Sequence, residues 1–123
     1  GEFKLPNGIA FSSDESSLYV ADTSDGWVYR FDVDGESLSN KTQFAQVKAE
    51  SGSEPMVDGV AVDADDNLFV AAHGGVGVFD KDGKQIDFIA IDAGHISNLE
   101  IGGKQQDLLM VTAYNKVLVF KLK

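Results

Sequence analysis

The sequence predicts an all-β protein built from β-propeller blades, and three observations support this prediction. Short strand patterns rich in Val, Ile, Phe and Tyr recur in three copies, turn residues separate the strands, and no segment keeps the apolar period of a helix. Four-stranded units that recur about every 40–50 residues are typical of propeller blades. A β-sandwich made from the same hairpins is the alternative, and the closeness of the repeats favours the propeller.

The first copy, residues 6–50, begins with Asn7-Gly8-Ile9-Ala10-Phe11 and is expected to form a four-stranded antiparallel blade. A cluster of Ser, Asp and Glu at 12–17 separates its first two strands, and Asp34-Gly35 is a strong hairpin signal. The fourth segment is more polar than the first three. Strands are expected at residues 8–11, 18–22, 27–32 and 42–47.

The second copy, residues 55–94, repeats this pattern 51 residues later with Asp58-Gly59-Val60-Ala61-Val62. Asp82-Gly83 again predicts a hairpin. The acidic run at 63–67 lacks the Gly and the distal Glu of a helical calcium loop, so we interpret it as a turn. Strands are expected at residues 59–62, 68–72, 76–80 and 86–91.

The third copy, residues 95–123, begins around Ser97-Asn98-Leu99-Glu100-Ile101 and is an incomplete blade, because it offers three strands and no fourth. Its last strand leaves an open edge at 117–122, and we expect a partner segment or the chain's own residues 3–5 to cover it. Strands are expected at residues 97–101, 109–113 and 117–121. Aromatic side chains expected to pack between blades are Phe11, Tyr19, Trp27, Phe31, Phe69, Phe79 and Phe120.

Length and charge limit the class of protein. The 123 residues suit one partial propeller domain over residues 1–123. The formal net charge of −10 argues against nucleic acid and anionic membranes as partners, and is compatible with a bound cation. The absence of Cys excludes disulfides and thiolate chemistry. No apolar run is long enough to span a bilayer, so we expect a soluble protein, whether cytoplasmic, periplasmic or secreted.

Three polar residues stand at equivalent places in the copies, because Asn7, Asp58 and Asn98 each lead a first strand. The first strand of a propeller blade lines the central channel, so these side chains are expected to gather at one channel mouth. Oxygen-bearing side chains from successive blades suit calcium, which takes about six to eight oxygen ligands. The alternative is that Asn-Gly and Asp-Gly only form turns before the strands.

Both His residues lie outside the expected strands. His73 follows a strand of the second copy beside two Gly, and is either a loop residue or a channel-mouth group that contacts substrate. His95 precedes the first strand of the third copy and could also approach the channel, but we expect it to be a surface loop residue.

Four motifs follow one another along nearly the whole chain. They are Leu-Pro-Asn-Gly-Ile-Ala-Phe-Ser (5–12) with 18–23, Val-Asp-Gly-Val-Ala-Val-Asp (57–63) with 67–71, the run 74–84, and 97–103 with 108–113. In this order they resemble the senescence marker protein/gluconolactonase family, which includes regucalcin and bacterial lactonases. The resemblance implies a six-bladed propeller with one divalent metal, often calcium, in its channel, and hydrolysis of a sugar lactone. The chain would supply about three blades, the C-terminal half of such a propeller.

The resemblance also implies roles for individual residues. Asn7 and Asp58 match two metal ligands of the family, and the equivalent of Asp58 is also a suggested proton-transfer group. The family's early Glu ligand would precede Gly1, and no residue here matches it. His73 and Asn98 are the candidates for contact with a small lactone or sugar-like ligand.

Three functions follow as hypotheses: a metal-dependent lactonase, a non-catalytic propeller module that binds a partner, or an inactive half-propeller fragment. Assembly is open in the same way. The chain is a piece of a larger protein, or pairs with a second copy as a homodimer that closes the ring, or stands alone with blunted edges.

Overall fold

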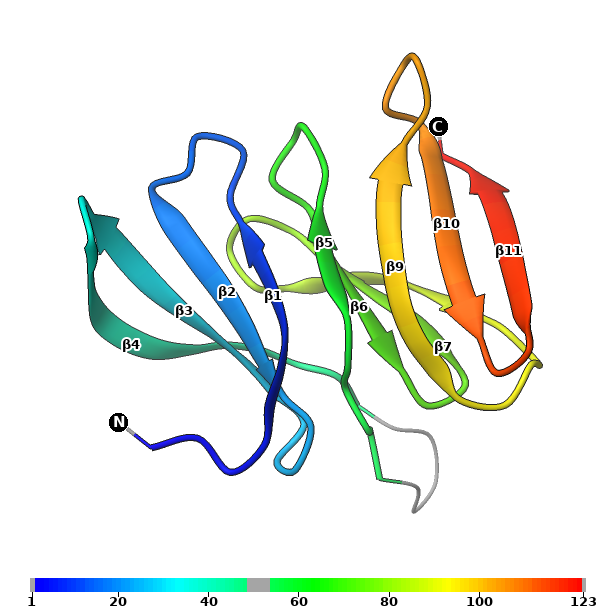
Figure 1. The fold of residues 1–123 in the computed structure, drawn as a ribbon, viewed down its shortest axis with the longest axis horizontal. Helices are drawn as coiled ribbons and strands as arrows, with labels where there is room; N and C mark the ends of the chain where they lie inside the picture. The colour runs from blue at the N-terminus through cyan, green and yellow to red at the C-terminus, as the bar shows by residue number, and fades with distance from the viewer. Residues whose placement is uncertain (1, 49–53, 123) are drawn as a thin grey trace.

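The computed structural model describes residues 2–48 and 54–122, which form three antiparallel sheets standing side by side (Figure 1). The first sheet contains β1 (Pro6–Phe11), β2 (Ser17–Asp22), β3 (Trp27–Asp34) and β4 (Ser37–Gln46). The second contains β5 (Val60–Val62), β6 (Leu68–Ala72), β7 (Gly75–Phe79) and β8 (Gln85–Ala90). The third contains β9 (Ile96–Gly102), β10 (Leu108–Ala113) and β11 (Lys116–Lys121).

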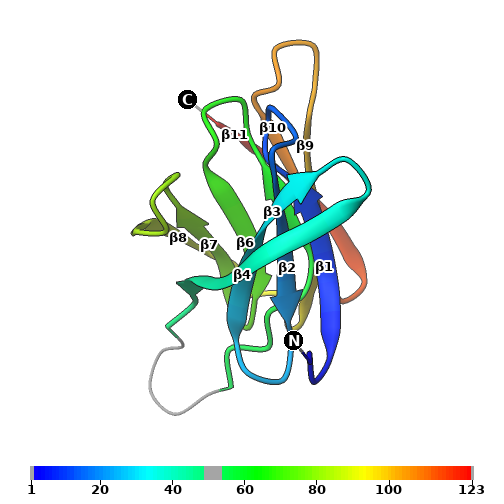
Figure 2. The same cartoon turned by 90° about the vertical axis from the view of Figure 1, so that its left-hand side faces the viewer.

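The arrangement of these sheets confirms the prediction of propeller blades. Within each sheet the strands lie in the order in which they occur along the chain. The first strand of each sheet is the innermost, with β1 in contact with β5 and β5 in contact with β9 (Figures 1 and 2). The described residues contain no helix, as predicted, and therefore none that could cross a bilayer.

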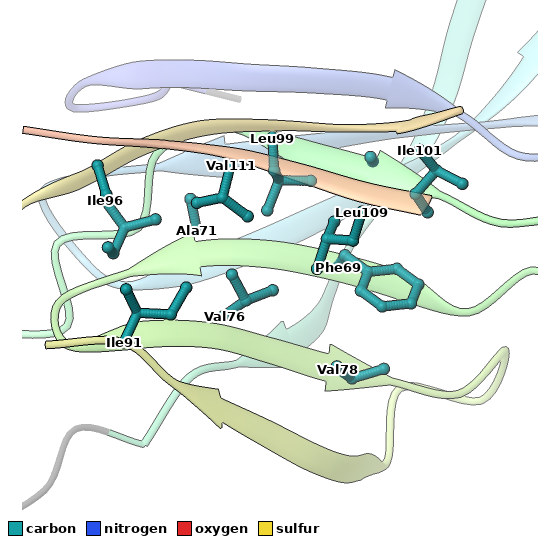
Figure 3. Close-up of a cluster of buried hydrophobic side chains, with 12 residues drawn as sticks. Phe69, Ala71, Val76, Val78, Ile91, Ile96, Leu99, Ile101, Leu109 and Val111 are labelled. Carbon is teal, nitrogen blue, oxygen red and sulfur yellow. The ribbon is translucent and has the colours of Figure 1, made fainter. Parts of the chain in front are cut away.

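Apolar side chains fill the space between neighbouring sheets. One cluster lies between the first and second sheets and includes Tyr19, Val28, Leu68 and Phe79. The other lies between the second and third sheets, where side chains of β6 and β7 meet those of β9 and β10 (Figure 3). Alternate residues of each strand enter these clusters, which is why short period-two patterns located the strands. The labelled members in Figure 3 are Phe69, Ala71, Val76, Val78, Ile91, Ile96, Leu99, Ile101, Leu109 and Val111.

The two outer faces of this three-sheet stack are only partly covered. Ile9 and Phe11 on the first sheet are 63% and 49% exposed, and Val117 and Val119 on the third are 70% and 59% exposed. The prediction that Phe11 packs between blades is wrong for the described residues, because Phe11 belongs to neither of the two apolar clusters. Tyr19, Phe69 and Phe79 are buried as predicted.

The edge of the third sheet is not covered by the start of the chain. Residues 3–5 lie instead against the first sheet, where the Phe3 ring makes an edge contact with Tyr29 at 5.4 Å between ring centroids. Thr23 N also donates to Leu5 O at 3.0 Å. The expectation that residues 3–5 add to β11 is therefore wrong. Among the described strands β11 pairs only with β10.

Strand β4 is longer than its sequence suggested, starting at Ser37 rather than near residue 42. Its first four residues are exposed, and Leu38 is the one apolar residue among them, so they lack the apolar alternation that marks a strand. The hairpin turns were predicted correctly. Gly35 and Gly83 have φ of 60° and 84°, and the acidic run 63–67 closes a turn in which Asp63 N donates to Asn67 O at 3.0 Å.

Candidate functional site

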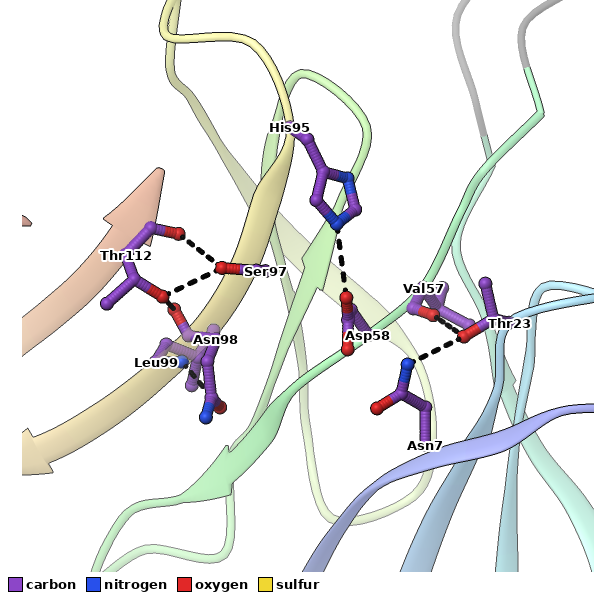
Figure 4. A network of polar contacts seen from close by, with 9 residues as sticks. All are labelled: Asn7, Thr23, Val57, Asp58, His95, Ser97, Asn98, Leu99 and Thr112. Atoms are coloured by element: carbon purple, nitrogen blue, oxygen red, sulfur yellow. Dashed lines mark hydrogen bonds and ion pairs between the residues drawn. The ribbon is translucent and has the colours of Figure 1, made fainter. Parts of the chain in front are cut away.

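The candidate site lies where the three innermost strands run side by side (Figure 4). Asn7 is the second residue of β1, Asp58 precedes β5 by two residues, and Asn98 is the third residue of β9. In Figure 4, Asp58 lies between the other two side chains, in the order in which the blades follow one another. The sequence prediction that these heads of strands are neighbours is therefore correct.

The glycines that follow Asn7 and Asp58 are there because the next blade comes close. A Cβ on Gly8 would overlap the carbonyl oxygen of Asp58 and lie 2.9 Å from the Cα of Gly59. A Cβ on Gly59 would overlap the side-chain oxygen of Asn98 and lie 2.8 Å from its Cα. Real Cβ atoms do not approach other atoms so closely. Each glycine thus allows the backbone of one innermost strand to pack against the next blade.

The backbone around Asp58 is extended rather than turned. Asp58 N donates to Ala71 O at 2.9 Å, and Ala71 N donates to Gly59 O at 2.8 Å, which continues the ladder between β5 and β6. Gly59 N donates across to Ser97 O of the third sheet at 3.0 Å. The alternative that Asp58-Gly59 forms only a turn is therefore wrong, and the same holds for Asn7-Gly8 within β1.

One hydroxyl links Asn7 to the segment that carries Asp58. Asn7 Nδ2 donates to Thr23 Oγ1 at 3.3 Å, and Thr23 Oγ1 donates to the carbonyl oxygen of Val57 at 2.7 Å (Figure 4). Val57 is fully buried between the sheets and directly precedes Asp58. Asn7 Oδ1 makes no hydrogen bond with the other described residues, so it is free to accept from water or to bind a cation.

His95 contacts Asp58, which the sequence did not lead us to expect. His95 Nε2 lies 3.1 Å from Asp58 Oδ2, and the side chains are 44% and 18% exposed. Because a carboxylate only accepts hydrogen bonds, the proton in this contact is on Nε2. The interpretation of His95 as a surface loop residue was therefore incomplete. The sequence feature that could have indicated this contact is the position of His95 directly before β9, the innermost strand of the third sheet.

Asn98 and His73 lie at the same end of the strands as Asp58. Asn98 Oδ1 accepts from the main-chain N of Leu99 at 2.9 Å, which directs its Nδ2 group toward the open space. His73 is exposed in the turn between β6 and β7, and its main-chain N donates to Pro55 O at 2.9 Å. Among the described residues its side chain makes no hydrogen bond or ion pair with Asp58 or Asn98, so the structure does not join His73 to these two residues.

A buried carboxylate fixes the chain entering β1. Asp22, 1% exposed, accepts from the main-chain N of Lys4 at 2.7 Å, of Leu5 at 3.1 Å and of Ser24 at 3.0 Å. Burial alone would raise the pKa of the Asp22 carboxyl, but these main-chain donors hold that pKa below its ordinary value. Asp22 therefore anchors the segment that leads to Asn7.

The free side-chain oxygens of Asn7 and Asp58 are of the type that binds a hard cation, but they are fewer than such a cation needs. One amide oxygen and one carboxylate oxygen have no hydrogen-bond partner in residues 2–48 and 54–122. Within those residues, no three His, Cys, Asp or Glu side chains converge on one point. Calcium needs about six to eight oxygens, so main-chain carbonyls, water or chain beyond this sequence would complete the shell.

Antiparallel sheets arranged with their first strands innermost are the architecture of β-propeller blades, and Asn7, Asp58 and Asn98 lie near the heads of those strands. The SMP-30/gluconolactonase/LRE-like region matches residues 1–115. The chain is 34% identical over 121 residues to a gluconolactonase of Zymomonas mobilis, and 34% identical over 97 residues to lactonase drp35 of Staphylococcus aureus. The chain belongs to the SMP-30/gluconolactonase family.

Solved structures agree with this assignment. A gluconolactonase from Xanthomonas campestris superposes on the whole chain with a TM-score of 0.85 and 30% identity. A calcium-binding regucalcin from Agrobacterium tumefaciens superposes on 93% of the chain with a TM-score of 0.79, and at 24% identity it supports the fold alone. The chain spans 34% of the Zymomonas protein and 39% of the Xanthomonas one, so it represents part of a propeller.

Proposed function

We propose that Asn7 and Asp58 hold a divalent cation, with calcium the expected metal, in the channel of a sugar-lactone hydrolase. The supporting observation is that each residue has one terminal atom held by a neighbour and one oxygen left over. Thr23 binds Asn7 Nδ2, and His95 binds Asp58 Oδ2. This leaves Asn7 Oδ1 and Asp58 Oδ1, two acceptors on adjacent innermost strands, for the cation. Membership of the family supports the same assignment.

The chain's own residues would contribute proton transfer and substrate contacts. When bound, a divalent cation supplies Lewis-acid polarisation of an ester carbonyl. In this proposal Asp58 would accept a proton from an attacking water, while His95 contacts its Oδ2 atom. Asn98 Nδ2 is a donor for a sugar hydroxyl, and His73 is a second candidate. A groove of about 330 Å³ beside Asn98, lined also by Ile9, Val60, Met110 and Thr112, offers space for a small lactone.

The test measures hydrolysis of gluconolactone by acid release, with and without excess chelator, in the parent chain and in Asp58→Asn. We expect chelator-sensitive hydrolysis that Asp58→Asn abolishes. Calcium binding by calorimetry is measured in parallel. Hydrolysis that neither chelator nor Asp58→Asn alters would contradict the proposal.

A second candidate function is a non-catalytic part of a propeller that assembles with a partner. The observation that favours it is the exposure of Ile9, Phe11, Val117 and Val119 on the two outer faces of the stack. Light scattering after size exclusion distinguishes the cases, because a homodimer would have twice the 13.2 kDa mass of the chain. A stable dimer without lactonase activity would favour this second function over the first.

A further inference from the structure

We infer that Thr23 is the positioning residue that decides which atom of Asn7 faces the channel and keeps Asn7 in register with Asp58. Thr23 lies in the turn after β2, on the blade that carries Asn7, and touches the blade that carries Asp58. Thr23 itself is outside the proposed ligand set, and it acts on the ligand Asn7. Only the expected effect on cation affinity rests on the proposed metal site.

The direction of the hydrogen bonds follows from elementary chemistry. A main-chain carbonyl has no proton, so Thr23 must give its single hydroxyl proton to Val57 O, at 2.7 Å. The hydroxyl oxygen can then only accept. Its remaining neighbour, 3.3 Å away, is the terminal amide of Asn7, which must therefore present its Nδ2 group. Asn7 Oδ1 is consequently turned away from Thr23.

The direction of these hydrogen bonds matters because the two ends of an asparagine side-chain amide have nearly the same shape, but one end donates and the other accepts. With Nδ2 on Thr23, the free end of Asn7 is an acceptor, and it joins the carboxylate of Asp58 in a region that attracts cations. With the amide reversed, a donor would face the channel, and Asn7 could not bind a cation through its side-chain oxygen. The buried carbonyl of Val57, acting through the Thr23 hydroxyl, thereby determines that Asn7 presents an acceptor.

The same hydroxyl also sets the spacing of the two candidate ligands. Val57 and Asp58 are consecutive, and Val57 is fully buried, so its carbonyl is fixed by the packing between the sheets. Thr23 N donates to Leu5 O at 3.0 Å, which fixes the Thr23 backbone to the segment before Asn7. Thr23 is thus held on both sides of the contact between blades. Groups that orient metal ligands in this way typically affect affinity by about 10–100-fold.

The test compares Thr23→Val, which keeps the shape but has no hydroxyl, with Thr23→Ser, which keeps the hydroxyl. Thr42→Val is the matched control, because Thr42 is exposed on β4 and its hydroxyl donates to Arg30 O at 3.4 Å, far from Asn7 in the sheet. The first readout is the ¹H–¹⁵N spectrum of the Asn7 side-chain amide, assigned from its loss in Asn7→Asp. The second is calcium affinity by calorimetry, and thermal melting confirms that each variant folds.

We expect Thr23→Val to move the Asn7 amide signals toward those of a free amide and to weaken calcium binding at least tenfold. Thr23→Ser and Thr42→Val should resemble the parent in both readouts. Unchanged Asn7 signals in Thr23→Val would overturn the inference, and so would shifted signals with unchanged calcium affinity. If the parent's calcium affinity proves insensitive to Asp58→Asn, the proposed metal site fails, whereas the amide spectra still decide the role of Thr23.

Discussion

His95 and Asp58 meet across the boundary between two blades, with 3.1 Å between Nε2 and Oδ2 although 37 residues separate them in the sequence. The contact occupies one of the two carboxylate oxygens of the only anionic candidate ligand. We therefore expect His95→Ala to strengthen calcium binding, by up to about fivefold, because an exposed pair of this kind contributes up to about 1 kcal/mol. Calorimetric titration measures the change, and His73→Ala serves as the control. Weaker binding in His95→Ala would contradict this prediction.

Replacing Asp58 by Asn should remove calcium binding and leave folding nearly intact. The parent site is expected to be weak, toward the millimolar end of calcium affinities, because the described residues offer so few ligands. Within residues 2–48 and 54–122, the exposed His95 is the one side-chain partner of Asp58, so the free energy of unfolding should change by less than about 1 kcal/mol. Asp65→Asn changes the net charge equally at an exposed turn and is the control. Calorimetry and urea unfolding together decide the outcome, and unchanged affinity in Asp58→Asn would refute the ligand assignment.

Adding a methyl group at Gly8 should destabilise the contact between the first two blades. In Gly8→Ala the new Cβ would meet main-chain atoms of Asp58 and Gly59, which cannot move independently, so we expect a loss of about 1–3 kcal/mol. Gly102→Ala is the matched control, since its Cβ would meet only the flexible end of Met110, at 3.1 Å. Urea unfolding provides the comparison. Equal stability of the two variants would show that the strands can separate without cost.

The carboxylate of Asp22 should make stability depend on pH. Its pKa is lowered in the folded state, so its stabilising effect is complete above the unfolded pKa, near 4, and is lost as the pH falls through the lower folded value. Asp22→Asn offers one acceptor in place of two, and we expect a loss of about 1–3 kcal/mol at pH 7. Urea unfolding at pH 7, 5 and 3 should show the difference between parent and variant shrinking at pH 3. A difference that stays constant with pH would mean that the charge of Asp22 is not involved.

Relieving a positive φ at Glu15 should stabilise the chain. Glu15 has φ of 62° in the turn between β1 and β2, and Asp66 and Gln106 have φ of 61° and 55° in the equivalent turns. A left-handed conformation costs a residue with a Cβ about 1 kcal/mol relative to Gly. We expect Glu15→Gly to raise stability by up to about 1 kcal/mol and Glu15→Val to lower it. Thermal melting of both variants tests the prediction, which fails if their order is reversed.

Much of the fold could be predicted from the sequence because each strand is short, alternates in polarity and ends at a turn residue. Strand β6 was placed at its observed bounds, whereas β4 was begun too late because Leu38 is the one apolar residue in 37–41. Phe11 was assigned to a core because its pattern is that of a buried strand, but the face it occupies has no neighbouring sheet among the described residues. The apolar alternation of a strand shows which side chains share a face of the sheet. It does not show what packs against that face.

The candidate site was predictable only in part. The repeat placed Asn7, Asp58 and Asn98 on neighbouring strands, because equivalent positions in successive blades must lie side by side. Contacts between blades were not predictable, since the partners are far apart in sequence and depend on how closely the sheets approach. The His95–Asp58 pair and the link through Thr23 to Val57 are both of this kind.

The missing side chains of Gly8 and Gly59 also limit which blades could be exchanged between relatives. Where the backbone of one innermost strand packs against the next blade, there is no room for a Cβ atom. A substitution in a neighbouring side chain cannot make that room, because main-chain atoms are among those in the way. A blade from another propeller could therefore replace the blade that precedes Asp58 or Asn98 only under one condition. The donor blade must carry a glycine directly after the Asn or Asp at the head of its first strand. Chimaeras built at these junctions should be selected by that single residue rather than by overall similarity of the donor.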